Sequence, residues 1–542
     1  MIKLLLQVNN TLYIYITNYP IMKPLKLLAA ALVCITVLFS FTAEERKKAE
    51  DSPIKIETGL ITGVKSKNSD VIAYKGIPFA LPPVKELRWR APQPAKPWTG
   101  IRKCTTYGPD PVQNPPKPMS MWSEEFLIPK ESIRSEDCLY LNVWTAAKSA
   151  KEKRPVLVWI YGGGFNSGGS NVPIYDGEAT ATKGIVFVSF NYRVGIFGSF
   201  AHPELTKESG YSASGNYGLL EQIAALKWVQ KNIAAFGGDP ENVTIAGQSA
   251  GSMSVNCLIA SPLAKNLFQK AIAESGASMV GSVRGMRNLQ QATEQGITIA
   301  QTLKTTTLAD LRNMPAEDLQ NRAKGAFGPI IDGYVLPEAI PAIFAANKQN
   351  NVALLTGWNE NEGMLYGTLK NAENFRKQAE QTYGANARTF LTYYPANTED
   401  EATSSQYKLS KDIMFGIQNY TLANVESERG TKVYVYRFTH KVPGTGIYEN
   451  IGAFHTGEVG YAYDNLKFIN RPWQPADHEL AHTISSYWAN FIKYGNPNGK
   501  GLPNWPSYTT NSNQIMILGD TPTAKALPDK AALDLLLTTI KP

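Results

Sequence analysis

A serine between two glycines lies within the segment Val243–Ser252. The β-branched run Val243-Thr-Ile245 predicts a short buried strand, and Gly247-Gln-Ser-Ala-Gly251 follows it without a loop. Glycines two residues before and after Ser249 allow a sharp turn from strand to helix, which would expose the serine hydroxyl as a nucleophile. Because this short motif also occurs by chance, the hypothesis requires three partners: a general base, an acid that orients the base, and donors for an oxyanion.

Candidate oxyanion donors follow another predicted strand. The apolar run Val156–Ile160 leads within two residues into Gly162, Gly163 and Gly164. Backbone without side chains allows N–H groups to approach a ligand closely, so we expect the amides of Gly163 and Gly164 to act together with the amide of Ala250.

A candidate base and two candidate acids also come after predicted strands. His455, one of five histidines, lies in a glycine-flanked loop after the strand Val433–Phe438. Glu360 and Glu362 both follow the strand Val352–Thr356, and the sequence pattern leaves the choice between them open. Either acid gives the chain order serine, glutamate, histidine, which is the order found in α/β-hydrolases.

A second motif, His478-Glu-Leu-Ala-His482, matches the helical zinc-binding pattern of metallopeptidases. Both histidines would face away from the apolar stripe of the same helix, which contains Leu480, Ile484 and Phe491. Catalytic zinc also needs a third protein ligand. Neither histidine nor glutamate follows His482, so we interpret the motif as a solvated helix face.

Buried apolar strands alternate with amphipathic helices over much of the chain, which predicts an α/β fold with a mostly parallel central sheet and helices on both faces. Two polar, mostly helical segments near residues 280–350 and 366–430 are expected to be insertions over the active site. The predicted strands are 156–160, 185–190, 243–245, 352–356 and 433–438. The predicted helices are 219–233, 250–259, 267–273 and 480–491.

The sequence resembles the type-B carboxylesterases, the cholinesterase and carboxylesterase group of the α/β-hydrolases, from about Gly59 to Tyr508. The resemblance implies the α/β-hydrolase fold and hydrolysis of small-molecule esters without a metal or other cofactor. The matching segments are Gly76-Ile-Pro-Phe-Ala80, Ser135-Glu-Asp-Cys-Leu-Tyr-Leu-Asn142, Trp159-Ile-Tyr-Gly-Gly-Gly-Phe165, Asn191-Tyr-Arg193, Phe236-Gly-Gly-Asp-Pro240, Gly247-Gln-Ser-Ala-Gly251, Ile331-Asp-Gly333 and Trp488-Ala-Asn-Phe491.

Residue by residue, the resemblance implies that Ser249 is the nucleophile, His455 the base and Glu362, rather than Glu360, the acid. It likewise implies that Gly163, Gly164 and Ala250 are the oxyanion donors. Some similar proteins bind partners without catalysis, but those typically lack the nucleophile, which this chain retains. Covalent labelling by an organophosphonate would distinguish an esterase from such a binding protein.

The N-terminal segment has the pattern of a secretory signal peptide, residues 1–43, possibly with an upstream extension over residues 1–21. Lys23 and Lys26 precede the apolar run Leu27–Phe41, which is short for a membrane span. Cleavage near Ala43 removes three lysines and no acid, so the formal charge falls from +8 to +5. This modest charge has no basic run, which argues against a nucleic-acid partner.

Length and composition are those of a globular chain, and residues 44–542 are expected to form a single catalytic domain that is secreted or periplasmic. Of the four cysteines, Cys34 would leave with the signal peptide. In an oxidising compartment the sequence then predicts a disulfide between Cys104 and Cys138, with Cys257 as a buried thiol.

Overall fold

The computed structural model describes residues 53–540 except 116, 119–122, 282–285 and 364–367. The predicted signal peptide, residues 1–43, lies outside the described residues. Pro53–Pro542 forms one compact unit. In the described part of the chain, no helix is long and apolar enough to cross a membrane.

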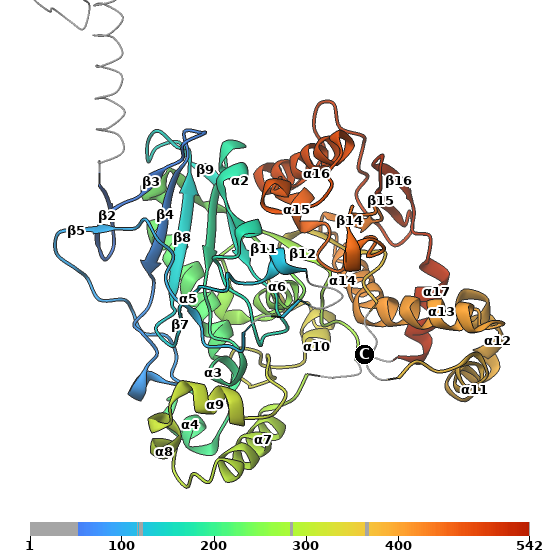
Figure 1. Ribbon diagram of the computed structural model, residues 1–542, viewed down its shortest axis with the longest axis horizontal. Coiled ribbons are helices and arrows are strands. Elements are labelled where there is room, and N and C mark those ends of the chain that lie inside the picture. Colours follow the sequence, from blue (N-terminus) through green and yellow to red (C-terminus); the bar gives the residue numbers. More distant parts are fainter. Residues whose placement is uncertain (1–52, 116, 119–122, 282–285, 364–367, 541–542) are drawn as a thin grey trace, which may run out of the picture. The chain divides into compact units, whose positions relative to one another are not determined.

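An eleven-stranded sheet forms the centre of this unit, in the order β16-β15-β14-β13-β12-β11-β9-β10-β8-β4-β3 (Figure 1). Its strands are β3 (Val64–Lys65), β4 (Ile72–Pro78), β8 (Tyr140–Thr145), β9 (Arg154–Ile160), β10 (Val186–Phe190), β11 (Gly238–Gln248), β12 (Lys270–Glu274), β13 (Ala353–Asn359), β14 (Val433–Phe438), β15 (Gln514–Leu518) and β16 (Thr523–Ala526). A small three-stranded sheet contains β1 (Ile54–Ile56), β2 (Gly59–Thr62) and β5 (Ile101–Lys103). A two-stranded sheet contains β6 (Asp110–Pro111) and β7 (Arg134–Ser135).

The strands from β10 to β15 in this order run parallel, whereas β8, β4 and β3 on one side and β16 on the other are antiparallel to their neighbours. The prediction of a mostly parallel sheet is therefore confirmed. Strands β10, β12 and β14 are buried along their whole length, as expected for strands covered on both faces.

Helices surround the sheet. They are α2 (Glu178–Thr182), α3 (Gly195–Ser199), α4 (Pro203–Glu208), α5 (Tyr217–Asn232), α6 (Ala250–Ala260), α7 (Leu289–Thr302), α8 (Leu308–Asn313), α9 (Ala316–Arg322), α10 (Ile340–Ala345), α11 (Ala372–Tyr383), α12 (Ala387–Tyr393), α13 (Glu399–Lys411), α14 (Ile417–Glu428), α15 (Val459–Ala462), α16 (Pro475–Tyr494) and α17 (Lys530–Thr539). A π-helical turn, η7 (Asp412–Gly416), joins α13 to α14. Short 3-10 helices are η1 (Lys85–Leu87), η2 (Glu124–Phe126), η3 (Pro173–Tyr175), η4 (Ile233–Phe236), η5 (Pro262–Ala264), η6 (Gly384–Asn386), η8 (Gly446–Tyr448) and η9 (Leu466–Phe468).

Helix α6 packs against β11 and β12 and also against α5 and α10, whereas α16 packs against β9 and β11. The last long helix ends at Gly495, whose φ of 66° is the left-handed conformation typical of a glycine that ends a helix. The segments near residues 280–350 and 366–430 contain α7–α10 and α11–α14, of which α14 packs directly against β13 and β14. Helices α4, α7, α8 and α9 lie together (Figure 1), and their residues Leu205, Ile299, Leu311 and Leu319 belong to a second hydrophobic cluster, which also includes residues of α3 and α5.

The helix predicted for residues 267–273 is wrong, because Lys270–Glu274 is strand β12, which pairs in parallel with β11 and β13. A short apolar run has too few residues for its periodicity to distinguish a helix from a buried strand.

The predicted disulfide between Cys104 and Cys138 is wrong, because both cysteines are free, buried thiols. Hydrogen bonds with Thr62 and Lys75 hold the backbone of Cys104 beside β2 and β4. Cys138 instead lies in the turn before β8, near the charges of Glu221 and Arg193. Each thiol therefore has its own packed surroundings. Burial raises the pKa of Cys104 to about 11, which keeps its thiol protonated.

Two carboxyl groups are buried at the C-terminal end of the parallel strands. Glu274 ends β12 and accepts hydrogen bonds from Trp488 Nε1, at 2.7 Å, and from the Tyr463 hydroxyl, at 3.0 Å. Burial raises the pKa of Glu274 to about 8. Burial, followed by repulsion from the charge of Glu274, raises the pKa of Glu458 well above its usual range. The pair therefore retains protons at pH values where an exposed glutamate is ionised.

We predict that Glu274→Gln makes stability less dependent on pH. Between about pH 4.5 and 8 the folded protein keeps the Glu274 proton that the unfolded chain has lost, so the free energy of unfolding falls as the pH rises. This group can contribute a slope of at most ~1.4 kcal/mol per pH unit. The melting temperature should therefore fall less from pH 5 to pH 8 in the variant than in the wild type. Parallel curves for the two proteins would contradict the assignment of a buried, protonated Glu274.

Candidate active site

Ser249 occupies the turn between β11 and α6, where its φ of 58° and ψ of −122° are strained for a residue other than glycine. Its backbone N–H donates to the Glu274 carbonyl at 2.9 Å, and its own carbonyl accepts from the Met253 N–H at 2.9 Å. These two bonds fix the turn at both ends. The serine is thus held where parallel strands of an α/β sheet end, which is the usual location of ligand sites in such folds.

The glycines on either side of the serine are required by close backbone packing. A Cβ atom on Gly251 would lie 2.0 Å from the Ile160 carbonyl oxygen, and one on Gly247 would lie 2.5 Å from the Gly251 carbonyl group. Real Cβ atoms do not approach backbone this closely. The glycine spacing that marked the motif in the sequence therefore allows the turn to pack against the end of β9.

The glycine-rich segment after β9 lies directly beside the serine. A Cβ atom on Gly162 would be 3.1 Å from the Ser249 Cβ, and Gly163 and Gly164 have left-handed φ values of 113° and 61°. Among the described residues, no carbonyl accepts a hydrogen bond from the amide of Gly163 or Gly164. Ala250 begins α6, and the first N–H groups of a helix have no partner within it. The segment that carries two of the candidate oxyanion donors therefore adjoins the serine turn through Gly162, and the third candidate, Ala250, directly follows the serine.

His455 and Glu362 form a buried pair. The Nδ1 atom of His455 lies 2.8 Å from Glu362 Oε2, and neither side chain is exposed to solvent. The other carboxylate oxygen of Glu362 accepts the Asn359 backbone N–H at 2.8 Å. A carboxylate in this position selects the tautomer of the imidazole and stabilises its protonated form.

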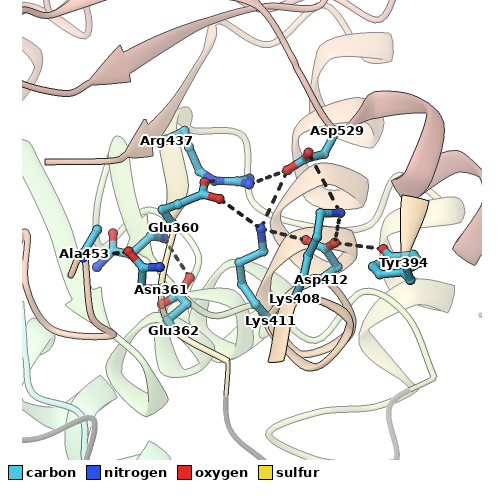
Figure 2. Close-up of polar contacts among 11 residues, drawn as sticks. Glu360, Asn361, Glu362, Tyr394, Lys408, Lys411, Asp412, Arg437, Ala453 and Asp529 are labelled. Carbon is cyan, nitrogen blue, oxygen red and sulfur yellow. Dashed lines mark hydrogen bonds and ion pairs between the residues drawn. The ribbon is translucent and has the colours of Figure 1, made fainter. Parts of the chain in front are cut away.

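Glu360, the other candidate acid, lies in a cluster of charged side chains (Figure 2). Its carboxylate lies 2.9 Å from Arg437 Nε and 3.9 Å from Lys411 Nζ. Arg437 also pairs with Asp529, and Lys411 lies 3.1 Å from Asp412. The two glutamates, although only two residues apart, therefore have different surroundings.

The loop that carries His455 is bound to both neighbouring loops. Gln248, which precedes Ser249, donates from Nε2 to the His455 carbonyl at 2.6 Å. The backbone N–H of Asn361 donates to the Ala453 carbonyl at 2.9 Å, and the Ala453 N–H donates to Asn361 Oδ1 at 2.9 Å (Figure 2). The structure therefore brings the predicted serine, histidine and glutamate loops together.

No sequence pattern indicates one neighbour of the histidine. The Phe415 ring lies 4.5 Å from the imidazole of His455, measured between centroids, at an interplanar angle of 30°. Phe415 belongs to the π-helical turn η7, within the second insertion, and such turns are frequent at functional sites. Two further neighbours lie close to predicted features, since Gln248 is part of the serine motif and Asn359 follows the predicted strand Val352–Thr356 by three residues.

A cavity of about 30 Å³ opens beside the serine turn. No residue in its described lining carries a charged side chain; the lining consists of Gln113, Phe126, Leu127, Ile128, Gly162, Gly163, Ser167, Gly168, Tyr175 and Gln248. Burial raises the pKa of Tyr175 well above that of a free tyrosine, so its hydroxyl is neutral.

The alternative zinc motif lies elsewhere. His478, Glu479 and His482 are exposed on α16. Within the described ranges of the chain, no group of three histidine, cysteine, aspartate or glutamate residues is arranged to hold a metal ion. This geometry agrees with a solvated helix face.

Comparison with known proteins gives the same class of protein. Residues 50–535 match the family model described as the carboxylesterase family. The fumonisin B1 esterase of Sphingopyxis macrogoltabida is 34% identical over 520 residues, covering 90% of this chain and 91% of the relative. The liver carboxylesterase of Sus scrofa is 35% identical over 509 residues, covering 84% of this chain and 87% of the relative.

Solved structures show the same fold. A PNB esterase structure superposes with a TM-score of 0.75 at 33% identity, covering 90% of this chain and 99% of that structure. A carboxylesterase from Geobacillus stearothermophilus superposes with a TM-score of 0.76 at 29% identity, with coverage of 89% and 99%. The chain has the α/β-hydrolase fold and belongs to the type-B carboxylesterase family, whose members hydrolyse carboxylic esters.

Proposed function

We propose that Ser249, His455 and Glu362 form the catalytic triad of this esterase and that the amides of Gly163, Gly164 and Ala250 bind the oxyanion. The observation that carries the proposal is the buried 2.8 Å contact between His455 and Glu362. It is supported by the bond from Gln248, next to Ser249, to the His455 carbonyl. A serine, a base and an orienting acid on three adjoining loops are the parts that acyl transfer requires.

In the first half-reaction, Ser249 Oγ attacks the ester carbonyl while His455 Nε2 accepts the hydroxyl proton. The new C–O bond produces a tetrahedral oxyanion, which the three amides stabilise. Glu362 stabilises the imidazolium without accepting its proton. The C–O bond to the leaving alcohol then breaks, and His455 gives its proton to that alcohol. The product is an acyl-enzyme on Ser249.

The second half-reaction repeats these steps with water. His455 removes a proton from the water molecule as its oxygen attacks the acyl carbonyl, and the same amides hold the second oxyanion. Collapse releases the carboxylic acid and returns the proton to Ser249 Oγ. The triad therefore ends in its starting state, and the reaction needs no cofactor.

The lining of the cavity beside Ser249 favours an uncharged substrate group. Its described part is apolar or carries neutral amide and hydroxyl groups, such as Phe126, Ile128 and Gln248. A charged group placed there would lose its hydration without gaining an ionic partner. We therefore propose that the part of the ester that enters this cavity is small and neutral.

We also propose that the enzyme is exported. The support is the order of the N-terminal segments, in which Lys23 and Lys26 precede the apolar run Leu27–Phe41 and a small-residue exit at Ala43.

Ser249→Ala is expected to lower kcat/KM for p-nitrophenyl acetate by at least about 10⁴-fold, because the variant lacks the hydroxyl that attacks the ester carbonyl. Circular dichroism and the melting temperature should show that the variant remains folded. Ser486→Ala, which changes a half-buried serine on α16 whose hydroxyl bonds to the His482 carbonyl of the same helix, serves as the control and should retain wild-type activity. A fully active Ser249→Ala protein would refute the assignment of the nucleophile.

The two glutamates of the acid loop offer a matched comparison. Glu362→Gln should lower kcat by roughly 10³- to 10⁴-fold, because a neutral amide cannot stabilise the imidazolium or accept its Nδ1–H as a carboxylate does. Glu360→Gln removes one charge from a half-exposed ion pair and should change kcat by less than about threefold. Steady-state kinetics of both variants tests this, and equal losses would argue against Glu362 as the acid.

Export predicts a shortened mature chain. Expressed with its full N-terminus in a bacterial host, the protein should be recovered outside the cytoplasm and begin close to residue 44. N-terminal sequencing and cell fractionation measure this, with a chain that starts at residue 44 as the cytoplasmic control. Recovery of the intact N-terminus from the cytoplasm would contradict export.

A further inference from the structure

Asn359 lies between the acid and the base and contacts both of their loops. It is the last residue of β13, three positions before Glu362, and it is fully buried. Its backbone N–H donates to Glu362 Oε1 at 2.8 Å. Its side-chain Nδ2 donates hydrogen bonds to the Phe454 carbonyl, at 2.7 Å, and to the carboxyl group of Glu458. The same nitrogen lies 3.3 Å from the His455 carbonyl oxygen. One residue therefore contacts the acid and three residues of the segment that carries the base.

These contacts surround His455 from both directions along the chain. Phe454 immediately precedes the histidine, and Glu458 follows it by three residues at the start of α15. The carbonyl of His455 also accepts a hydrogen bond from Gln248 Nε2, which belongs to the serine loop, at 2.6 Å. The backbone on which the imidazole is mounted is thus bound by amide donors from the serine loop and from the acid strand.

Most of these bonds use donors that an asparagine supplies and an apolar side chain does not. The acceptors are two backbone carbonyl oxygens and an oxygen of the Glu458 carboxyl group, all buried. A leucine of similar volume at position 359 would leave these acceptors without the hydrogen bonds that the asparagine donates. The hydrogen bond from the backbone N–H of residue 359 to Glu362 would remain. A change at this side chain therefore separates the placement of the base from the placement of the acid.

We propose that Asn359 is a positioning residue, whose side-chain amide fixes the segment Phe454–Glu458 so that the His455 imidazole stays aligned between Ser249 and Glu362. This inference rests on the proposed triad. Misplacement of a catalytic group by about 1 Å can cost roughly 10²-fold in rate. The amide acts through the backbone of the base and does not touch the substrate.

Asn465 provides a matched control. It is also fully buried, and its Nδ2 likewise donates to two backbone carbonyls, those of Ile174 at 2.8 Å and Asp176 at 2.9 Å. Among the described residues, no hydrogen bond joins its side chain to the three loops of the triad. Loss of either amide should cost similar stability, but only one loss should disturb the base.

The test compares Asn359→Leu with Asn465→Leu. Both variants should show similar falls in melting temperature. Asn359→Leu should lower kcat for p-nitrophenyl acetate by about 10- to 100-fold with KM within about threefold, whereas Asn465→Leu should keep kcat within about threefold. The low-field proton resonance of the His455 Nδ1–H should broaden or disappear only in Asn359→Leu, which a merely structural role would not produce.

If Asn359→Leu fails to fold, Asn359→Ser provides a smaller, polar replacement that can make at most one of the side-chain bonds, and the same loss of kcat is expected. A folded variant at position 359 whose kcat matches that of Asn465→Leu, with an unchanged imidazole resonance, would overturn the proposal. Failure of the proposed triad would give a different result. In that case either the wild-type protein would not hydrolyse the ester, or the Ser249→Ala variant would remain active.

Discussion

A buried hydrogen bond between Glu362 and His455 joins the loops after β13 and β14, and the rest of the site depends on it. Both side chains are removed from water, so the carboxylate has strong electrostatic influence on the imidazole. Such a pair is useful only when both groups are held rigidly. The surrounding structure supplies this rigidity through hydrogen bonds between the base loop and the side-chain amides of Asn359, Asn361 and Gln248; the Asn359 and Gln248 amides donate, and the Asn361 amide oxygen accepts.

The parallel sheet brings these loops together. Strands β11, β13 and β14 end at the same edge, so residues more than 200 positions apart in the sequence, such as Gln248 and His455, become hydrogen-bonded neighbours. The strained turn at Ser249 is tolerated because Gly247 and Gly251 let it pack against the end of β9. The second insertion adds Phe415 against the imidazole, which connects a segment outside the sheet to the catalytic pair.

Much of this arrangement could be predicted from the sequence. Long apolar runs identified β9, β10 and β14, and motif spacing together with family resemblance singled out Ser249, Glu362 and His455. Short elements were harder, since the apolar run of β12 has no distinct period and β15 and β16 were not identified. The disulfide was inferred from cysteine number and an expected compartment, but neither specifies distance, and the two thiols are separately buried. Contacts such as Asn359 with Phe454 depend on tertiary packing and leave no pattern along the chain.

The central claim is that Ser249 is a nucleophile activated by His455 and Glu362. Mass spectrometry of the wild-type protein after reaction with a p-nitrophenyl organophosphonate tests it most directly, because the adduct forms on the activated hydroxyl itself. We predict one phosphonyl group per chain, attached to Ser249, together with loss of ester hydrolysis. An unmodified protein, or an adduct on another residue with full loss of activity, would contradict the account.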